Sequence, residues 1–383
     1  MDDRVDESVS IEAQPYVLAV SLEPLDASTT LFLGHLAERM SDALQVVRYA
    51  DPELGEKVAN ASAIILVRGL FELDGVFLAV RALRIPLYYF VDDNFILLRE
   101  QAGPWSPFVR RYSAANVRRR LRAFHGVLLS SDELIDYYRA EHLHHELTLF
   151  PPIEWQQHLS RPSASPHAVS IAFFGGLHLH EMFWTCILPA VRRLAIDRPV
   201  TLIAAGVNGA IAPSPGLSVV EQPYDTSYAR GLRRLAATGV DVLVHPTAPG
   251  LDNGRYKNPH ALISANAIGA IPAVSDRPPY SDLRQAGVAL LCDDSSESWY
   301  AAFAQVAQPA KRLPIGERLE QFCSSHYGGR INREVVDKML SLHRAPSARW
   351  RGVRTSVVRA AVLLGRIRPA VARLRPARLR GQL

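Results

Sequence analysis

Short apolar segments alternate with longer stretches of mixed polarity through the first 150 residues. The stretches between them, such as Thr29–Met40 and Asp132–Ala140, have the composition of helices. Short buried strands that alternate with helices are typical of a parallel sheet with helices on both faces. The expected strands are Tyr16–Ser21, Leu44–Tyr49, Ala63–Val67, Ile85–Val91, His125–Ser130 and Leu147–Phe150.

The alternation stops at residues 160–167, which are rich in Ser and Pro and have no apolar period. We interpret them as an inter-domain linker. The pattern restarts at Val169–Phe174 and continues beyond Ile271–Ser275. We therefore expect an α/β protein of two Rossmann-like, doubly wound parallel-sheet domains, residues 1–159 and 168–343. Ligands of such sheets bind at the carboxyl ends of the strands, so two facing sheets predict a cleft between the domains.

Size and composition fit this plan. A chain of 383 residues is long enough for two domains, and its three cysteines are far apart and odd in number. That predicts reduced thiols and neither a disulfide frame nor a zinc site. The polar, acidic start of the chain lacks a secretory signal, and no apolar run of about 18 residues is present. We expect a cytoplasmic protein.

The net charge of +5 is unevenly distributed, because residues 344–383 hold 11 arginines and no lysine or acidic residue. The rest of the chain is therefore acidic. This basic tail could attract an anionic membrane surface, at about 1 kcal/mol for each basic residue, or be a solubilising disordered end. Its apolar content favours a peripheral position on the inner face of the plasma membrane. It has no aromatic pattern or module that would indicate nucleic acid.

A glycine pair follows the strand Val169–Phe174. Gly175 and Gly176 precede a helix whose free N–H groups and dipole suit an anion such as a diphosphate. His178 and His180 follow and could donate to a phosphate. The alternative is a strand–helix turn that needs glycine for its geometry, with two solvated histidines.

A long polar loop follows the strand that ends at His245-Pro246. Arg255 and Lys257 lie just ahead of the next helix, where their charge and the helix dipole would both favour a phosphate. The alternative is a set of solvated loop charges. The loop carries Asp252, Asn253, Arg255, Lys257 and Asn258.

Asp92, Asp93 and Asn94 follow the strand Ile85–Val91. Carboxylates at the end of a strand can bind substrate hydroxyls or act as a base, so Asp92 and Asp93 are the catalytic candidates. They could equally cap the next helix. Ser130 and Ser131 are expected to be caps. We see no cluster of ligands for a divalent ion.

Several segments together resemble the GT-B glycosyltransferases, and most of all the retaining group called family 4 or "glycosyl transferases group 1". The resemblance covers roughly residues 60 to 335. It implies a nucleotide-sugar donor on the second domain, beside Gly175, Gly176, Lys257 and Asn258, with no further cofactor. The matching segments are Pro86–Phe95, Val127–Tyr138, Val240–Pro246, Tyr256–Asn258, Ala265–Ser275, Asp276–Tyr280, Val288–Cys292 and Asp293–Ser298.

One position departs from this family. Ser264 stands where the family has a glutamate that binds the donor ribose, and Asp252 is the nearest candidate for its upstream acidic partner. Two hypotheses follow. The first is a retaining, metal-independent transferase that moves a sugar to a glycan or lipid-linked acceptor, as in polysaccharide biosynthesis. The second, which Ser264 favours, is a non-catalytic scaffold of the same shape in a glycan assembly complex.

Overall fold

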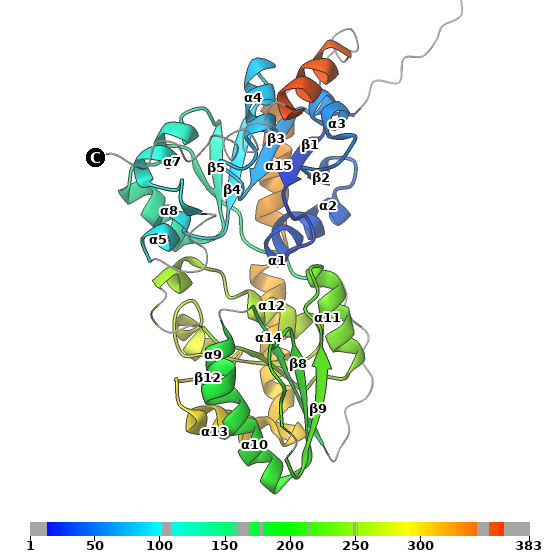
Figure 1. Cartoon of the computed structure of the whole chain (residues 1–383), viewed down its shortest axis with the longest axis vertical. Coiled ribbons are helices and arrows are strands. Elements are labelled where there is room, and N and C mark those ends of the chain that lie inside the picture. The colour runs from blue at the N-terminus through cyan, green and yellow to red at the C-terminus, as the bar shows by residue number, and fades with distance from the viewer. Residues whose placement is uncertain are drawn as a thin grey trace, which may run out of the picture.

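The computed structural model describes residues 14–101, 109–155, 158–159, 168–176, 179–212, 214–247, 250, 252–342 and 352–363. The expected linker at 160–167, His178 and most of the basic tail lie outside these residues. Two lobes are stacked along the long axis of the molecule, one built from the first half of the chain and one from the second (Figure 1).

The first lobe is a six-stranded sheet in which every neighbouring pair is parallel, in the order β2-β1-β3-β4-β5-β6. All side chains of β1 and β3 are buried, because helices cover both faces of the sheet. The strands are β1 (Val17–Ser21), β2 (Leu44–Arg48), β3 (Ala63–Val67), β4 (Leu87–Val91), β5 (Gly126–Leu129) and β6 (Leu147–Leu149). The helices are α1 (Ala27–Thr29), α2 (His35–Arg39), α3 (Leu54–Asn60), α4 (Asp74–Ala82), α5 (Phe95–Glu100), α7 (Ala114–Leu121) and α8 (Asp132–Ala140).

The second lobe repeats the plan with the order β12-β11-β10-β7-β8-β9, again parallel throughout. The expected two-domain fold is confirmed. The strands are β7 (Val169–Phe174), β8 (Val200–Ala205), β9 (Leu217–Gln222), β10 (Val242–His245), β11 (Ile271–Ser275) and β12 (Leu290–Cys292). The helices are α9 (His180–Met182), α10 (Leu188–Asp197), α11 (Tyr228–Ala237), α12 (His260–Ala267), α13 (Ser296–Val306), α14 (Pro309–His326) and α15 (Arg330–Leu342).

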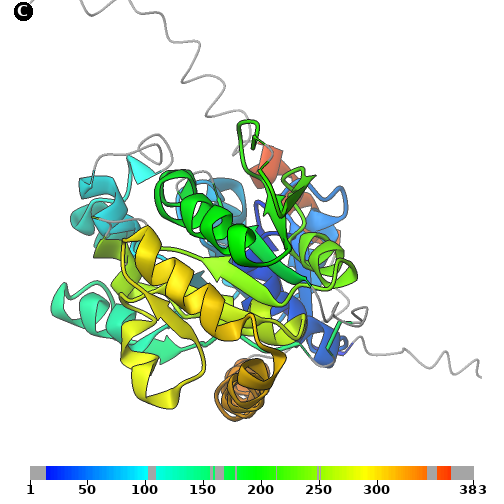
Figure 2. The same ribbon diagram turned by 90° about the horizontal axis from the view of Figure 1, so that it is seen from below.

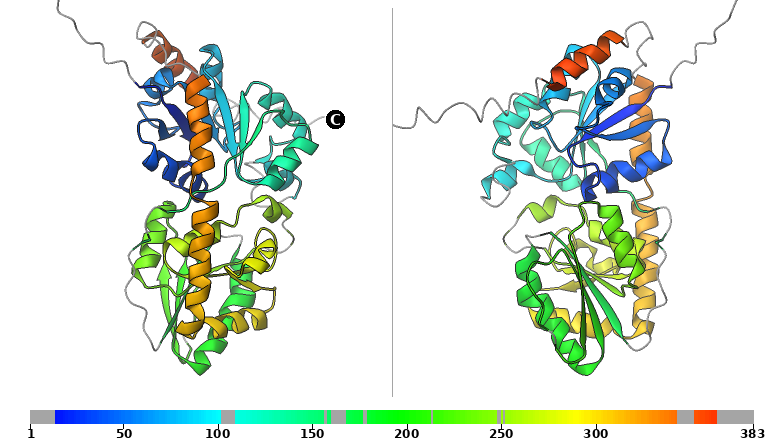
Figure 3. Two further views of the ribbon diagram at one scale, coloured as in Figure 1. Left: turned by 180° about the vertical axis from the view of Figure 1, so that it is seen from behind. Right: turned by 45° about the vertical axis from the view of Figure 1, so that its right-hand side comes forward.

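After the second sheet, the chain returns to the first lobe through its two long helices. Helix α14 runs along the second lobe and α15 continues beside the first, as the rear view shows (Figure 3). Seen from below, the pair is viewed nearly end-on (Figure 2). Val336 of α15 is fully buried, and the Asn332 side chain donates to the carbonyl of Pro151 at 2.9 Å. From the sequence we expected all of 168–343 in the second domain, whereas α15 packs on the first lobe. The spacing of apolar residues predicts a helix but does not show which sheet the helix covers.

Part of the basic tail is also folded onto the first lobe. Residues 352–363 are helical, with Val358 and Val362 buried in the core that contains Leu54 and Val76. Gly75 of α4 allows this approach, since a Cβ there would lie 2.8 Å from the Cα of Val362. The tail therefore contributes to the first domain in this stretch. Within the described residues, no helix is both long and apolar enough to span a bilayer.

Candidate functional site

A cavity of about 630 Å³ lies between the two lobes and is lined by both. The carboxyl ends of β1, β3 and β4 line it from the first lobe, and those of β7, β8 and β10 line it from the second lobe. Each sheet has its switch point here: β1 lies between β2 and β3, and β7 lies between β8 and β10. Ligands of doubly wound sheets bind in this position, so the facing switch points make the cavity the candidate active site.

Both helices that begin at the switch points contain a π turn. These turns are Thr30–Gly34 after β1 and Phe183–Ile187 after β7. Such turns are rare and often occur at functional sites. Leu31 and Phe32 of the first turn line the cavity. The two lobes thus present similar strand–turn–helix units to the same space.

An ion cluster occupies the wall formed by the first lobe. Arg68 follows β3, and its Nη2 donates to Asp93 Oδ2 at 2.7 Å. Its Nε lies 3.1 Å from Asp92 Oδ1, although not in hydrogen-bond geometry. The two aspartates follow β4, the neighbouring strand, so parallel pairing brings the three residues together.

The second lobe completes this cluster. Lys257 Nζ lies 3.1 Å from Asp93 Oδ1, and Asn253 Nδ2 donates to the same oxygen at 3.0 Å. Asn253 Oδ1 in turn accepts from the backbone N–H of Asn94 at 2.9 Å. Lys257 and Asn253, two loop residues expected to face a donor, are therefore joined to Asp93 and its neighbour in the first lobe. Asp93 acts as a bridge between the domains in this conformation.

The two aspartates differ in electrostatics. Burial raises the pKa of Asp92, an effect that Arg68 opposes only in part and that Asp93 strengthens. Burial acts on Asp93 as well, but Lys257, Arg68 and the hydrogen bond from Asn253 outweigh it and hold its pKa below the ordinary value. Asp92 is thus the better proton acceptor of the two near neutral pH. The arginine pKa is raised, since three nearby carboxylates outweigh its burial.

The polar loop docks on the helix caps of the first lobe. Ser131 Oγ donates to the carbonyl of Tyr256 at 2.8 Å, and Asn258 Nδ2 donates to the carbonyl of Ser130 at 2.5 Å. Ser131 also caps α8 by accepting from Leu134 N, which confirms its expected role, whereas Ser130 precedes the cap and its buried Oγ has no hydrogen-bond partner. Asn94 caps α5 in the same way. The caps therefore position both their own helices and the opposite domain.

Asp252 and Arg255 are exposed and do not line the cavity. They lie in the 3₁₀ turn Asp252–Tyr256, where side chains three residues apart share a face. Asn253 is on the buried side of this turn. Arg255 stacks over the ring of Tyr256, with its Cζ 5.4 Å from the ring centroid. The structure thus separates these two from the loop residues that face the cleft.

The glycine turn after β7 lines the cavity through Gly175 and Gly176. A Cβ on Gly175 would lie 2.8 Å from Leu179 Cδ1 and 3.1 Å from Phe173 Cζ. A larger residue at this position would therefore have to displace the end of the Leu179 side chain. His178 lies outside the described residues, and His180 packs with the ring of Phe173 at a centroid distance of 6.4 Å.

Ser264 lines the cavity but is only 3% exposed. Its Oγ lies 2.5 Å from the hydroxyl of Tyr228 and donates to the carbonyl of His260 at 3.0 Å. Tyr228, at the start of α11, lines the same part of the cleft. The position that the sequence resemblance matched to a ribose-binding glutamate thus holds a serine–tyrosine hydroxyl pair.

The cavity is also lined by Arg68, Tyr224 and His245, which were not among the expected site residues. His245 ends β10, and its Nδ1 lies 3.3 Å from the carbonyl of Phe174. Burial lowers its pKa to about 3, and His260 beside it adds to the effect. His245 is therefore neutral, with Nδ1 as donor and Nε2 left as an acceptor. Its place at the carboxyl end of a strand was the sequence feature that could have identified it.

Structure comparison finds glycosyltransferases and related synthases. A sucrose-phosphate synthase from Thermosynechococcus elongatus is 12% identical, with a TM-score of 0.56, over 85% of this chain and 98% of that one. HepE from Anabaena, in complex with UDP and glucose, is 14% identical, with a TM-score of 0.53, over 86% and 100%. An alpha,alpha-trehalose 6-phosphate synthase from Burkholderia multivorans is 11% identical, with a TM-score of 0.53, over 86% and 97%.

No protein-family model and no curated protein matches the chain. At identities of 11–14% the structural likeness shows the fold. The chain has the two-domain GT-B architecture that its sequence segments resemble.

Proposed function

We propose that this protein transfers a sugar from a nucleotide-sugar donor to a hydroxyl group of a glycan or lipid-linked acceptor. The observation that carries the proposal is the cavity at the facing switch points, which has a glycine turn on one wall and a buried carboxylate on the other. A transferase needs both substrates held together with water excluded, and a cleft between two domains provides this.

The donor would lie against the second lobe. Gly175 and Gly176 leave backbone accessible to a diphosphate. Tyr224 follows β9, lines the cavity and is 70% exposed, so its ring is free to stack on a nucleobase. His245 presents a neutral Nε2 that can accept a bond from a sugar hydroxyl. The paired hydroxyls of Ser264 and Tyr228 would take the place of the family's glutamate at the ribose.

Lys257 would have two roles. It pairs with Asp93 here, yet its side chain is 38% exposed and can turn toward an entering diphosphate. Asp93 keeps Arg68 and Asn253 as partners when it does so. Donor binding would then compete with one bridge between the domains and loosen them.

Asp92 is the residue we assign to the acceptor. Its raised pKa and its position at the end of β4 suit a carboxylate that accepts a proton from, or orients, an acceptor hydroxyl. We further propose that the reaction needs no metal ion and no cofactor besides the donor. The support is that Arg68 and Lys257 already supply the positive charge beside both aspartates.

Retention of the anomeric configuration is proposed from the sequence resemblance, and a role in polysaccharide biosynthesis from the acceptor class. Peripheral binding to an anionic membrane rests on the arginines of 344–383. We favour an enzyme over a non-catalytic scaffold, because the similar structures include two synthases and a protein in complex with UDP and glucose.

The test is a thermal-shift and calorimetric screen against nucleotides and nucleotide sugars. A ligand present at 100 times its dissociation constant stabilises the native state by about 2.7 kcal/mol. The best donor is then titrated into Lys257→Ala, which should bind it about tenfold more weakly through loss of a charge-assisted bond. Exposed Lys338→Ala is the matched control. An unchanged dissociation constant for Lys257→Ala would remove this lysine from the donor site.

A further inference from the structure

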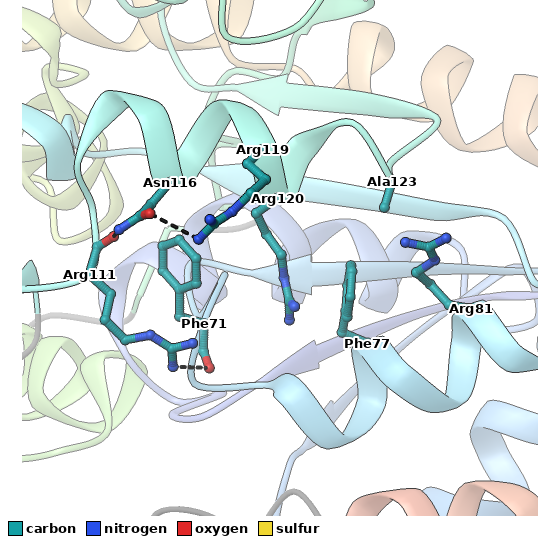
Figure 4. Close-up of a pocket in the computed structure, with 8 residues that line it drawn as sticks. All are labelled: Phe71, Phe77, Arg81, Arg111, Asn116, Arg119, Arg120 and Ala123. Carbon is teal, nitrogen blue, oxygen red and sulfur yellow. Dashed lines mark hydrogen bonds between the residues drawn. The ribbon is translucent and has the colours of Figure 1, made fainter.

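A second cavity, of about 250 Å³, lies on the first lobe outside the cleft. Its walls come from the loop after β3 and from helices α4 and α7 (Figure 4). Four arginines line it: Arg81, Arg111, Arg119 and Arg120. We call this cavity the arginine pocket.

Two aromatic rings hold the guanidinium groups of the arginine pocket in place. Arg120 Cζ lies 3.2 Å from the ring centroid of Phe77, and Arg111 Cζ lies 4.7 Å from that of Phe71. The close-up shows Arg120 pointing between the two rings (Figure 4). Stacking of this kind orders a guanidinium before any ligand arrives, which lowers the entropy lost on binding.

Positive charge exceeds negative charge around this pocket. Asp74 pairs with Arg120 at 2.5 Å and with Arg111 at 3.4 Å. The other adjacent carboxylate, Glu72, accepts a bond from Tyr112 at 2.9 Å. Four arginines therefore face two carboxylates, and two positive charges remain unmatched among these residues. Burial lowers the pKa of Arg120 to about 10, with Arg111 and Arg81 adding to the shift.

One donor atom of Arg120 is also left without a hydrogen-bond partner. The Nε of Arg120 is buried and makes no hydrogen bond, although its Nη2 is bound to Asp74. A buried donor without a partner costs free energy unless a ligand or water satisfies it. Arg81 and Arg119 are exposed, so the pocket is open to solvent.

We propose that the arginine pocket binds a phosphate group carried by a ligand. Guanidinium forks match phosphate oxygens in pairs. A phosphate monoester carries a charge of about −1.5 to −2 near neutral pH, which matches the two unmatched positive charges. The proposal does not depend on the donor site, because a diphosphate held at the glycine turn lies on the other lobe.

The arginine pocket is nevertheless adjacent to the cleft. Arg68 and Gly69 line the cleft, whereas Phe71, two residues later, lines the pocket. A phosphate bound here would lie behind the acceptor wall. The same chemistry has two sources, a soluble phosphate ester or the headgroup of a phosphate monoester lipid.

The test uses the full chain and a double substitution of the exposed arginines, Arg81→Gln with Arg119→Gln. These side chains have no carboxylate partner among the ion pairs described, so the fold should be retained, and a thermal melt checks this. The matched control, Arg139→Gln with Arg330→Gln, removes the same charge at side chains that are 67% and 88% exposed elsewhere. In the first arm, inorganic phosphate is titrated by calorimetry at about 0.15 M salt. In the second, vesicles of phosphatidic acid in phosphatidylcholine are compared with phosphatidylserine vesicles of equal surface charge.

We expect the pocket variant to lose at least tenfold in phosphate affinity, and the control less than twofold. Phosphate bound in the cleft would be unaffected by either change. If phosphate binding is lost with the pocket and the two vesicle types bind alike, the source is soluble. Selective loss of phosphatidic acid binding identifies the lipid. Equal behaviour of the pocket variant and the control in both arms would overturn the proposal, since only diffuse surface charge would then be at work.

Discussion

Replacing Asp93 by asparagine tests the bridge between the domains. The carboxylate accepts from Arg68 on one oxygen and from Asn253 and Lys257 on the other, and its side chain is 8% exposed. An amide has one acceptor oxygen, so either Arg68 or the pair from the second lobe must face an NH₂ group. Charge-assisted hydrogen bonds contribute about 1.5–3 kcal/mol each.

We expect Asp93→Asn to lower the free energy of unfolding by about 2 kcal/mol at pH 7. The contribution of Lys257 is discounted because the lysine is 38% exposed and can be solvated again. The substitution also removes the repulsion between the two carboxylates, which raises the pKa of Asp92, and this reduces the loss of stability. Asp136→Asn is the control, since this carboxylate is 72% exposed and pairs with Arg139 at the surface. The assay is urea unfolding followed by fluorescence and circular dichroism.

The lowered pKa of Asp93 determines how its stabilising effect changes with pH. The pKa of Asp93 is held low in the folded protein, so its stabilisation is fully present above the ordinary aspartate pKa of about 3.9. It is lost as the pH falls through the lower folded-state value. The difference between wild type and Asp93→Asn should therefore shrink below about pH 4. Equal stability at pH 7, or a difference that persists undiminished in acid, would refute the bridge.

Three further predictions concern other parts of the chain. Ser264→Glu should lower the melting temperature without tightening nucleotide binding, because Tyr228 fills the space a glutamate needs; a stable variant with higher affinity would contradict this. Truncation before residue 344 should destabilise the first domain by several kcal/mol, because Val358 and Val362 are buried; equal melting temperatures of the truncated and full-length chains would contradict this. Activity should survive EDTA, and loss that manganese reverses would instead make Asp92 a metal ligand.

The strands were predictable because buried parallel strands form apolar runs that are shorter than most helices and rich in β-branched and aromatic residues. Ala63–Val67 and Ile271–Ser275 were predicted with the observed bounds. Helix α15 and residues 352–363 were harder to place, since an amphipathic helical pattern does not show which sheet the helix covers. Their return to the first lobe depends on packing that local sequence does not contain.

The candidate site was predictable in outline. Asp92 and Asp93 were found because they follow a strand, but Arg68 was not, since its pairing depends on β3 and β4 being neighbours. The polar loop was found as a whole. Which of its residues face the cleft depends on the 3₁₀ turn, which places Asp252 and Arg255 on the outer side and Asn253 on the inner side.

The central claim is that the cleft transfers a sugar, and release of nucleoside diphosphate from a nucleotide sugar tests it most directly. Water can serve as the acceptor, so slow donor hydrolysis is a sufficient readout without the natural acceptor. The account predicts that wild-type protein releases the nucleotide, and that Asp92→Asn lowers the rate by about 10²-fold or more while donor affinity stays within twofold. Tight binding of a nucleotide sugar without any turnover, and with no effect of Asp92→Asn, would contradict the account and leave a binding protein of GT-B shape.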